Sequence, residues 1–183
     1  MSRIGKKTIV LPQGVNVTVA GKLVTVTGPK GTLSREINPK IEVKVEDGHV
    51  NVINNNVETQ YNAYHGLYRQ LIANMVEGVS KGFQKSLNVN GVGFKINQQG
   101  QDLVLNIGFS HPVVVKAIPG IELSCDKTTI TVKGIDKELV GQFAAKVRQI
   151  KPVEPYHAYG ISYTDETVVR KEVKSGKKNE TLF

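Results

Sequence analysis

The sequence predicts an α+β protein made of two similar domains from an internal duplication, each a mainly antiparallel β-sheet with one packed helix. Three observations support this fold class: short segments of alternating apolar and polar residues, two segments with helical spacing of apolar residues, and a partial repetition of the chain. A length of 183 residues suits one domain or two small ones. Hydrophobic residues make up 39% and charged residues 22%, a balance typical of folded proteins.

The first half opens with strand patterns. Valines alternate with polar residues from Val15 to Val19, and the alternation resumes after Gly21 over residues 23–28. Two such runs around a glycine turn predict a β-hairpin. We expect further strands at residues 32–37, 41–45 and 50–53, with Asp47-Gly48 as a hairpin turn.

A helix of about 20 residues is predicted next, because the apolar spacing changes to intervals of three and four. The stripe consists of Tyr64, Leu67, Tyr68, Leu71, Ile72, Met75, Val76 and Val79. We expect this whole stripe, including its tyrosines, to face the core. Gly82 follows as a stop signal.

The second half returns to strand patterns and ends in another helix. We expect strands at residues 87–96, 103–107, 113–116, 121–125 and 129–132. The second helix runs from Leu139 to Ile150, and Pro152 prevents its continuation.

The chain matches itself at a shift of 106 residues, which pairs Gly14 with Gly120 and Val24 with Ile130. The match indicates an internal duplication, although two glycine-bounded hairpins in register would also score well. We expect domains at residues 1–82 and 83–183, the second with a basic loop and tail.

Several classes of function are excluded by what the sequence lacks. The apolar runs are far shorter than the roughly 20 residues needed to cross a bilayer, so we expect no membrane span. The four histidines have no metal-ligand spacing, and Gly91-Val92-Gly93 lacks the third glycine of a dinucleotide fingerprint. No nucleophile elbow is present around Ser110, and Cys125 is the single cysteine. We therefore expect a cytoplasmic protein with no catalytic residues, metal, cofactor or small-molecule substrate.

The charge favours a polyanionic partner, because 24 Lys and Arg outnumber 16 Asp and Glu to give a net charge of +8. The cations cluster in the N-terminal arm, at the end of the second helix and in the tail. They are Arg3, Lys6 and Lys7, then Lys146, Arg148 and Lys151, and finally Arg170, Lys171, Lys174, Lys177 and Lys178. Solvated chain ends would give the same pattern.

Aromatic residues lie among these cations after Lys151. Tyr156, Tyr159 and Tyr163 have rings that could stack on unpaired bases while neighbouring cations contact phosphates. We add His157 and Gly160 of the same loop to the candidate RNA-binding residues. Buried tyrosines with satisfied hydroxyl groups would look the same in sequence.

Longer motifs run through the whole chain. The first helix and its end contain Ala63, His65, Gly66, Leu67, Arg69, Leu71, Ile72, Asn74, Met75, Val76, Gly78, Val79, Gly82 and Phe83. Gly28-Pro29-Lys30-Gly31 precedes it, and Gly91-Val92-Gly93-Phe94 and Ser110-His111-Pro112-Val113 follow. The C-terminal part contains Pro152, Glu154-Pro155-Tyr156, Gly160-Ile161, Tyr163, Lys171 and Gly176-Lys177-Lys178. In order and spacing these residues resemble the family of ribosomal large-subunit protein six, of the bacterial type.

The resemblance implies a non-catalytic constituent of the large ribosomal subunit. Members of that family bind large-subunit (23S-type) rRNA mainly through the C-terminal domain, near the sarcin-ricin loop and the stalk base, where translation factors dock. The implied partners are this rRNA, neighbouring large-subunit proteins and, indirectly, translation factors. A free-standing RNA-binding regulator is the alternative.

One segment departs from the family pattern. The family usually has Lys-Gly-Lys where this chain has His157-Ala158-Tyr159, and a basic residue where it has Ser162. We expect Tyr159, His157 and the tail lysines to take a larger share of RNA binding here.

Overall fold

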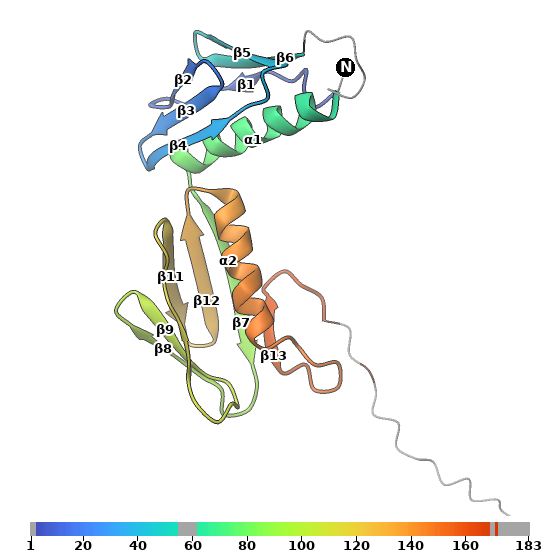
Figure 1. Cartoon of the computed structure of the whole chain (residues 1–183). Coiled ribbons are helices and arrows are strands. Elements are labelled where there is room, and N and C mark those ends of the chain that lie inside the picture. The colour runs from blue at the N-terminus through green and yellow to red at the C-terminus, as the bar shows by residue number, and fades with distance from the viewer. Residues whose placement is uncertain (1–2, 55–61, 169–170, 172–183) are drawn as a thin grey trace, which may run out of the picture. The chain divides into compact units, whose positions relative to one another are not determined.

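The computed structural model describes residues 3–54, 62–168 and 171. Over these residues the chain is an α+β fold with two helices and strands paired in antiparallel ladders (Figure 1). It divides into two compact units. The first unit takes its described residues from Met1–Lys85, Ile118–Glu122 and Val132–Gln142, and the second from Ser86–Ala117, Leu123–Thr131 and Phe143–Phe183.

The first half contains every strand that its sequence predicts, with ends shifted by one or two residues. The elements are β1 (Ile9–Val10), β2 (Asn16–Ala20), β3 (Leu23–Gly28), β4 (Gly31–Glu36), β5 (Ile41–Glu46), β6 (His49–Asn54) and α1 (Asn62–Ser80). They form two three-stranded antiparallel sheets, ordered β1-β6-β5 and β2-β3-β4. β1 was not among the predicted strands, because two residues are too few to show alternation.

The core of this half is made by strand valines and one face of α1. Val24, Val26 and Val50 are completely buried, and α1 adds Ile72 and Val79 among its buried residues. Burying β-branched side chains of this size contributes about 1.5–3 kcal/mol each. The apolar residues that alternate along each predicted strand are therefore the ones on the buried face of its sheet.

The predicted helix stripe is wrong at its N-terminal end. Tyr64 and Leu67 are 40% and 49% exposed, whereas His65 is 1% exposed. The first turns of α1 therefore turn a different face to the core from the one predicted. The His65 ring can be buried there because its Nε2 lies 2.7 Å from the Val52 carbonyl oxygen of β6, within hydrogen-bond distance. A sequence pattern that scores histidine as polar could not anticipate that partner.

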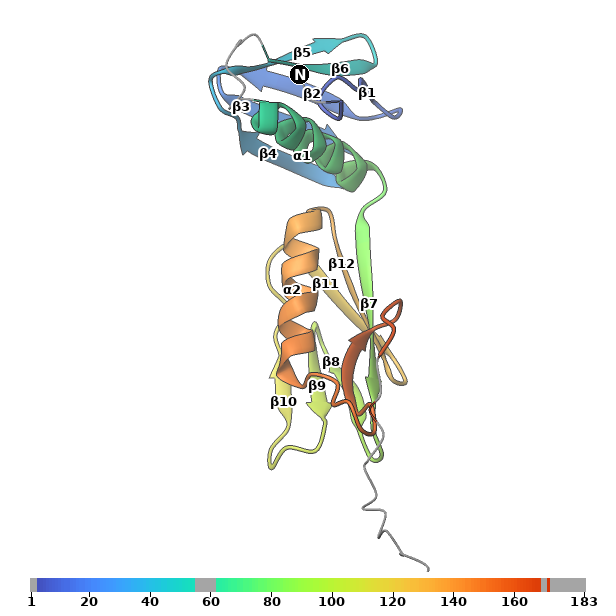
Figure 2. The ribbon, with the colours of Figure 1, turned by 90° about the vertical axis from the view of Figure 1, so that its right-hand side faces the viewer.

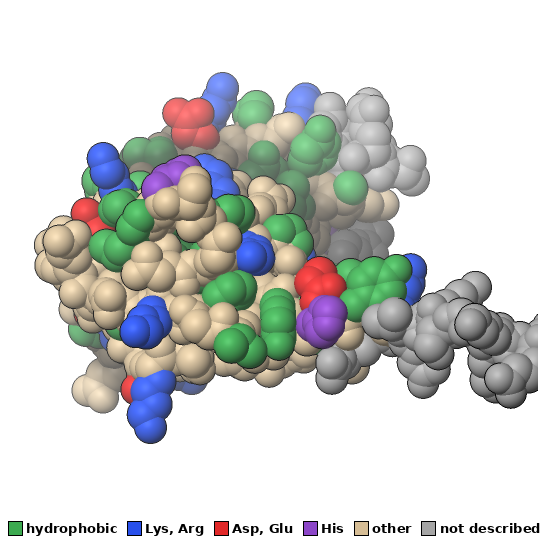
Figure 3. Space-filling view, turned by 90° about the horizontal axis from the view of Figure 1, so that it is seen from below, with side chains coloured by type: hydrophobic (Ala, Val, Ile, Leu, Met, Phe, Trp, Pro, Cys, Tyr) green, Lys and Arg blue, Asp and Glu red, His purple; other side chains and the backbone are tan. Residues whose placement is uncertain are grey.

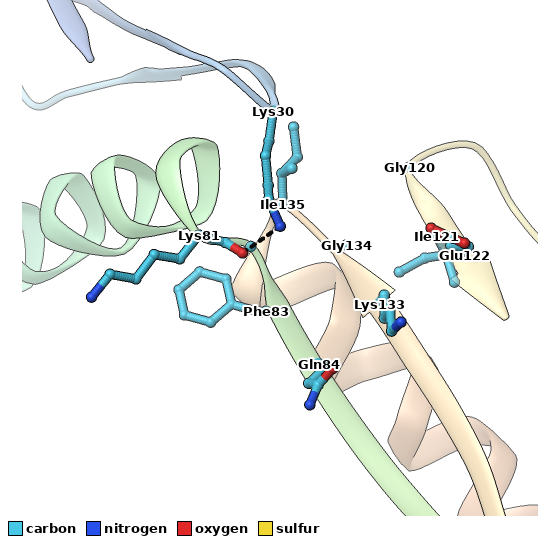
Figure 4. A pocket seen from close by; sticks show the side chains of 11 residues that line it. Lys30, Lys81, Phe83, Gln84, Gly120, Ile121, Glu122, Lys133, Gly134 and Ile135 are labelled. Carbon is cyan, nitrogen blue, oxygen red and sulfur yellow. Dashed lines mark hydrogen bonds between the residues drawn. The ribbon is translucent and has the colours of Figure 1, made fainter. Parts of the chain in front are cut away.

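The end of α1 is fastened by the turn between β3 and β4. Gly82 has a φ of 77°, the left-handed conformation that terminates helices. Lys30 donates from Nζ to the Lys81 carbonyl at 2.6 Å, drawn as a dashed line in Figure 4, and from its backbone N–H to the Val79 carbonyl at 2.9 Å. Lys30 thus binds the open carbonyls of the last turn, beside a pocket of the first unit that Phe83 also lines.

The second half has eight described elements. They are β7 (Phe83–Asn90), β8 (Lys95–Gln99), β9 (Asp102–Asn106), β10 (Val113–Val115), β11 (Ile121–Asp126), β12 (Thr129–Gly134), α2 (Lys137–Ile150) and β13 (Gly160–Tyr163). They form a three-stranded sheet, β10-β9-β8, and a four-stranded sheet, β11-β12-β7-β13. Within the second unit, α2 lies along one face of the four-stranded sheet (Figures 1 and 2). Its buried side chains, Val140, Phe143, Ala144 and Val147, have helical spacing.

Two predictions for this half are corrected. The strand predicted over residues 87–96 is interrupted between Asn90 and Lys95. Gly93 has a φ of 76°, and the Phe94 N–H is 3.3 Å from the Gly91 carbonyl, so the backbone turns instead of extending. β13 corrects a predicted loop, because the sequence shows no strand signal where these four residues follow a stretch rich in proline and tyrosine.

The two halves repeat one plan, at a different shift from the one matched in the sequence. In each half a three-stranded sheet is followed by a β-hairpin and a helix: β5, β6 and α1 in the first, β11, β12 and α2 in the second. Ile41 and Ile121 begin the equivalent strands, a shift of 121 − 41 = 80 residues. The shift of 106 had paired β2 and β3 with β11 and β12, hairpins at different places in the plan. β13 has no counterpart among the described elements of the first half.

The rotated face of α1 can be tested by stability. Ile72→Ala should lower the free energy of unfolding by about 2–5 kcal/mol, since Ile72 is 1% exposed and truncation leaves a cavity. Leu67→Ala should change it by no more than about 0.5 kcal/mol. Urea unfolding followed by circular dichroism measures both. Equal losses at the two positions would contradict the rotated face.

Candidate nucleic-acid interface

Three loops of the second unit meet at one end of it. They are residues 91–94 between β7 and β8, 107–112 between β9 and β10, and 151–159 between α2 and β13, and we call their joint surface the three-loop face. The Phe94 and Tyr159 rings meet edge to face at 6.3 Å, which joins the first loop to the third. Seen from that end, hydrophobic, cationic and histidine side chains share the surface (Figure 3).

The loop of residues 151–159 is organised around one carboxylate. Glu154 accepts hydrogen bonds from the backbone N–H groups of Tyr156 at 3.1 Å and His157 at 2.6 Å. Burial opposes the charged form, but these backbone hydrogen bonds prevail and hold the pKa of Glu154 below its ordinary value. The loop thus has a defined shape before any ligand binds.

Two rings of this loop, Tyr156 and His157, are exposed to solvent, and the half-buried Tyr159 ring connects His157 to the first loop. His157 stacks on Tyr159 with centroids 5.5 Å apart, and Tyr159 in turn contacts Phe94. Tyr156 is 49% exposed, and the His157 side chain is 65% exposed. Stacking on an unpaired base requires such an open ring face, so the buried alternative does not describe these two residues.

Gly160 and Tyr163 lie on β13, beside the face. β13 pairs with β7 in antiparallel register, which places Gly160 opposite Asn90 and Tyr163 opposite Leu87. Gly160 is buried with a φ of 143°, and a Cβ there would lie 2.6 Å from the Pro152 carbonyl oxygen and 2.8 Å from that of Lys151. Only glycine allows the two backbone segments to approach this closely.

Arg148 is paired with other residues of the second unit. Its guanidinium forms a bidentate ion pair with the Glu166 carboxylate and lies 5.4 Å from the centre of the Tyr163 ring. The hydrogen bond from Arg148, ahead of the opposing effect of burial, lowers the pKa of Glu166, and the same bond raises the pKa of Arg148. This pair fixes the end of α2 to the residues that follow β13.

The other predicted cations are placed differently. Lys146 on α2 is exposed and forms no ion pair with another described residue. Lys171 is exposed, and its N–H donates to the Pro155 carbonyl at 2.6 Å, which places the start of the tail beside the loop. The arm residues Arg3, Lys6 and Lys7 are exposed and belong to the first unit. Arg170, Lys174, Lys177 and Lys178 lie outside the described residues.

Two residues of the face were missed by sequence reasoning. Phe94 contacts Tyr159, and Phe109 is 46% exposed in the second loop. Each phenylalanine stands next to a glycine with positive φ, Gly93 or Gly108. An aromatic residue at a glycine turn between two predicted strands is the signal that could have found them.

Comparison with known proteins identifies the family. The model of the family described as ribosomal protein L6 matches residues 11–82 and 90–164. The chain belongs to the ribosomal protein L6 family. Its two matched spans begin 90 − 11 = 79 residues apart, close to the shift of 80 between equivalent strands.

Curated members of the L6 family are similar over nearly the full length. The large ribosomal subunit protein uL6 of Maridesulfovibrio salexigens is 51% identical over 178 residues, covering 97% of this chain and 100% of the relative. The proteins of the same name from Halalkalibacterium halodurans and Acaryochloris marina are 53% and 50% identical, each with 97% of this chain and 100% of the relative covered. An L6 protein is a structural protein and not an enzyme. No described helix is long and apolar enough to cross a membrane.

The middle residue of the segment His157-Ala158-Tyr159 has an unusual backbone conformation. Ala158 has a φ of 59°, in the left-handed region that favours glycine. An L-residue other than glycine pays about 1–2 kcal/mol for this conformation. Replacing Ala158 with glycine would remove this cost without changing the shape of the loop.

The close approach at Gly160 yields a stability test. Gly160→Ala should lower the free energy of unfolding by at least about 2 kcal/mol, since it adds a methyl group against two backbone carbonyls at an unfavourable φ. Gly141→Ala, on α2 with open space around its Cβ, is the matched control and should raise stability by roughly 0.5–1 kcal/mol. Thermal unfolding measures both variants. A Gly160→Ala protein as stable as wild type would contradict the described geometry.

The Arg148–Glu166 pair predicts a pH dependence. Because the folded-state pKa of Glu166 is depressed, its contribution to stability is present above its ordinary value of 4.5 and is lost as pH falls below it. Glu166→Gln should therefore be less stable than wild type at neutral pH, and the difference should shrink in acid. Arg148→Gln should lose the same pH-dependent contribution to the free energy of unfolding, because it removes the other partner of the pair. Urea unfolding between about pH 3 and pH 7 measures it, and a difference independent of pH would refute the assignment.

Proposed function

We propose that this chain is a structural constituent of the large ribosomal subunit in the cytoplasm. It binds 23S-type rRNA, mainly through residues 83–183, near the sarcin-ricin loop and the stalk base where translation factors dock. Its relatives are named large ribosomal subunit protein uL6, and this name supports the assignment of the chain to the large subunit. The position on the subunit rests on the family resemblance.

One observation supports the C-terminal half as the main RNA contact. β13 and the loop that leads into it are what this half has beyond the shared plan. That loop presents Tyr156 and His157 to solvent with Lys171 beside it. Open rings for bases beside cations for phosphates are the two elements of single-stranded RNA recognition.

The candidate residues then divide by role. Tyr156, His157 and Tyr159 stack on bases. Lys146, Lys171 and the tail residues Arg170, Lys174, Lys177 and Lys178 contact phosphates. Gly160, Tyr163 and the paired Arg148 shape the surface from β13 and α2.

The N-terminal residues have a separate part in this proposal. Residues 1–82 form a domain that contacts neighbouring large-subunit proteins, and Arg3, Lys6 and Lys7 add an RNA contact. Their exposure in the first unit supports this division. Translation factors are affected indirectly, through the RNA that the protein holds in place.

The tail lysines can be tested by the salt dependence of RNA binding. Replacing Lys171, Lys174, Lys177 and Lys178 with Ala should lower the magnitude of the slope of log affinity against log salt by about 3, since each phosphate contact contributes about 0.7–0.9. Filter binding to large-subunit rRNA over a salt series measures it. An unchanged slope would mean that these lysines do not contact phosphate.

Tyr156→Ala is the matched comparison for that experiment. A lost stacking contact of about 1–3 kcal/mol should weaken binding while leaving the salt slope unchanged. Circular dichroism should show an intact fold, because the Tyr156 side chain is half exposed. Unfolding of the variant would mean that the ring serves packing instead.

Sedimentation tests the function itself. A lysate run through sucrose gradients at low and moderate salt should show the protein with the large subunit and with assembled ribosomes, at about one copy per particle. A protein that remains at the top at both salts, while other large-subunit proteins sediment, would overturn the proposal. Tight binding to RNAs unrelated to the ribosome would then favour a free-standing regulator.

A further inference from the structure

The sequence predicts Lys151 as a phosphate-binding cation, yet its ammonium is directed into the three-loop face. Its Nζ donates to the Ile107 carbonyl at 2.8 Å. It also lies 4.7 Å from the centre of the Phe94 ring and 5.2 Å from that of the Phe109 ring. A cation at these distances is attracted to the face of each ring.

The surroundings of this ammonium are tightly packed. A Cβ at Gly108, whose φ is 84°, would lie 3.1 Å from the Lys151 Nζ and 3.2 Å from the Phe94 ring. The second loop therefore approaches the cation with bare backbone. No described carboxylate forms an ion pair with Lys151, so its contacts are a carbonyl and two rings.

The main chain of Lys151 forms a second junction. Its carbonyl accepts a hydrogen bond from the Ile161 N–H at 2.8 Å, which ties the end of α2 to β13. Ile161 is completely buried. Backbone and side chain of one residue thus connect α2, β13 and the loops on either side of the β8–β9 hairpin.

We propose that Lys151 is a positioning residue for RNA binding: its ammonium holds the loops of residues 91–94 and 107–112 against the loop of residues 151–159 and contacts no phosphate. This inference rests on the proposed function. The face that Lys151 assembles presents the exposed rings of Phe109 and Tyr156 to unpaired bases. Loops held in place beforehand bind with a smaller loss of conformational entropy.

The two roles of a lysine differ in salt dependence. A lysine on phosphate displaces counterions and contributes about 0.7–0.9 to the salt slope. A lysine that acts on other loops changes affinity at every salt concentration equally. Slope and affinity measured together therefore separate positioning from direct contact.

The test uses the full chain and deproteinised large-subunit rRNA. Lys151→Met keeps the aliphatic stem but removes the charge and the hydrogen bond. We expect affinity to fall about tenfold, from the loss of the hydrogen bond and both cation–π contacts, with the slope unchanged. Hydrogen exchange of backbone amides in residues 91–94 and 107–111 should accelerate, also without RNA.

Lys146→Met is the matched control, because Lys146 is an exposed lysine on the same helix. For Lys146→Met, the magnitude of the salt slope should fall by about 0.7–0.9, and hydrogen exchange in residues 91–94 and 107–111 should stay at the wild-type rate. Lys151→Arg, which keeps a cation above the rings, should restore slow exchange and most of the affinity. If Lys151→Met does not fold, Lys151→Gln replaces it, because glutamine also removes the charge but keeps a donor for the Ile107 carbonyl.

Three results would overturn the inference. A Lys151→Met slope lowered by about 0.7–0.9 with unchanged exchange would show a phosphate contact. Unchanged affinity beside wild-type binding would show that the loops need no such positioning. Failure of the wild-type protein to bind the rRNA would overturn the proposed function, and with it the RNA role of Lys151, so the two failures are distinguishable.

Discussion

The three-loop face depends on the junction between the end of α2 and the start of β13. The Lys151 carbonyl accepts the Ile161 N–H, and Gly160 passes so close to the carbonyls of Lys151 and Pro152 that a side chain there would collide with them. After the end of α2, nine residues form the loop, and the chain then rejoins the sheet as β13, which pairs with β7. The loop in between is confined to one surface, where the Lys151 side chain meets the other two loops.

The duplication separates what the two halves share from what the second half adds. Both halves use a three-stranded sheet, a hairpin and a helix, and in both the apolar faces of strands and helix form the core. Among the described elements, the second half adds a loop with two prolines and the strand β13 after its helix. In the proposed function, the shared plan supports the added segment, and that segment contacts RNA, as is common when binding residues lie on loops. The two spans of the family match begin 79 residues apart, close to the shift of 80 between equivalent strands.

Local sequence signals predicted much of the fold. Alternation located the strands because one side of each sheet is buried, as at Val24 and Val26. It failed where a tertiary partner decides the outcome: His65 is inside because of the Val52 carbonyl, and Tyr64 is consequently outside. The repeat was assigned at the wrong shift because similar residues in two hairpins outweighed the order of the elements.

The candidate site was predicted less completely, for a related reason. Composition shows that a cation is present but not which way it points. Lys146 is exposed, whereas Arg148 is paired with Glu166 and Lys151 is held by Ile107 and two rings, although all three belong to one charged cluster in the sequence. The rings were predicted in part, since Tyr156 and His157 are exposed as a base-stacking role requires, whereas Phe94 and Phe109 were missed.

An electron cryomicroscopy map of the large ribosomal subunit that contains this chain would show whether the three-loop face binds RNA and whether Lys151 shapes that face from within. We expect rRNA against residues 91–94, 107–112 and 151–159, with bases on the rings of this face and the Lys151 Nζ still at the Ile107 carbonyl. A map in which that face is free of RNA, or in which the Lys151 ammonium lies on a phosphate, would rule out this role for Lys151 and its face.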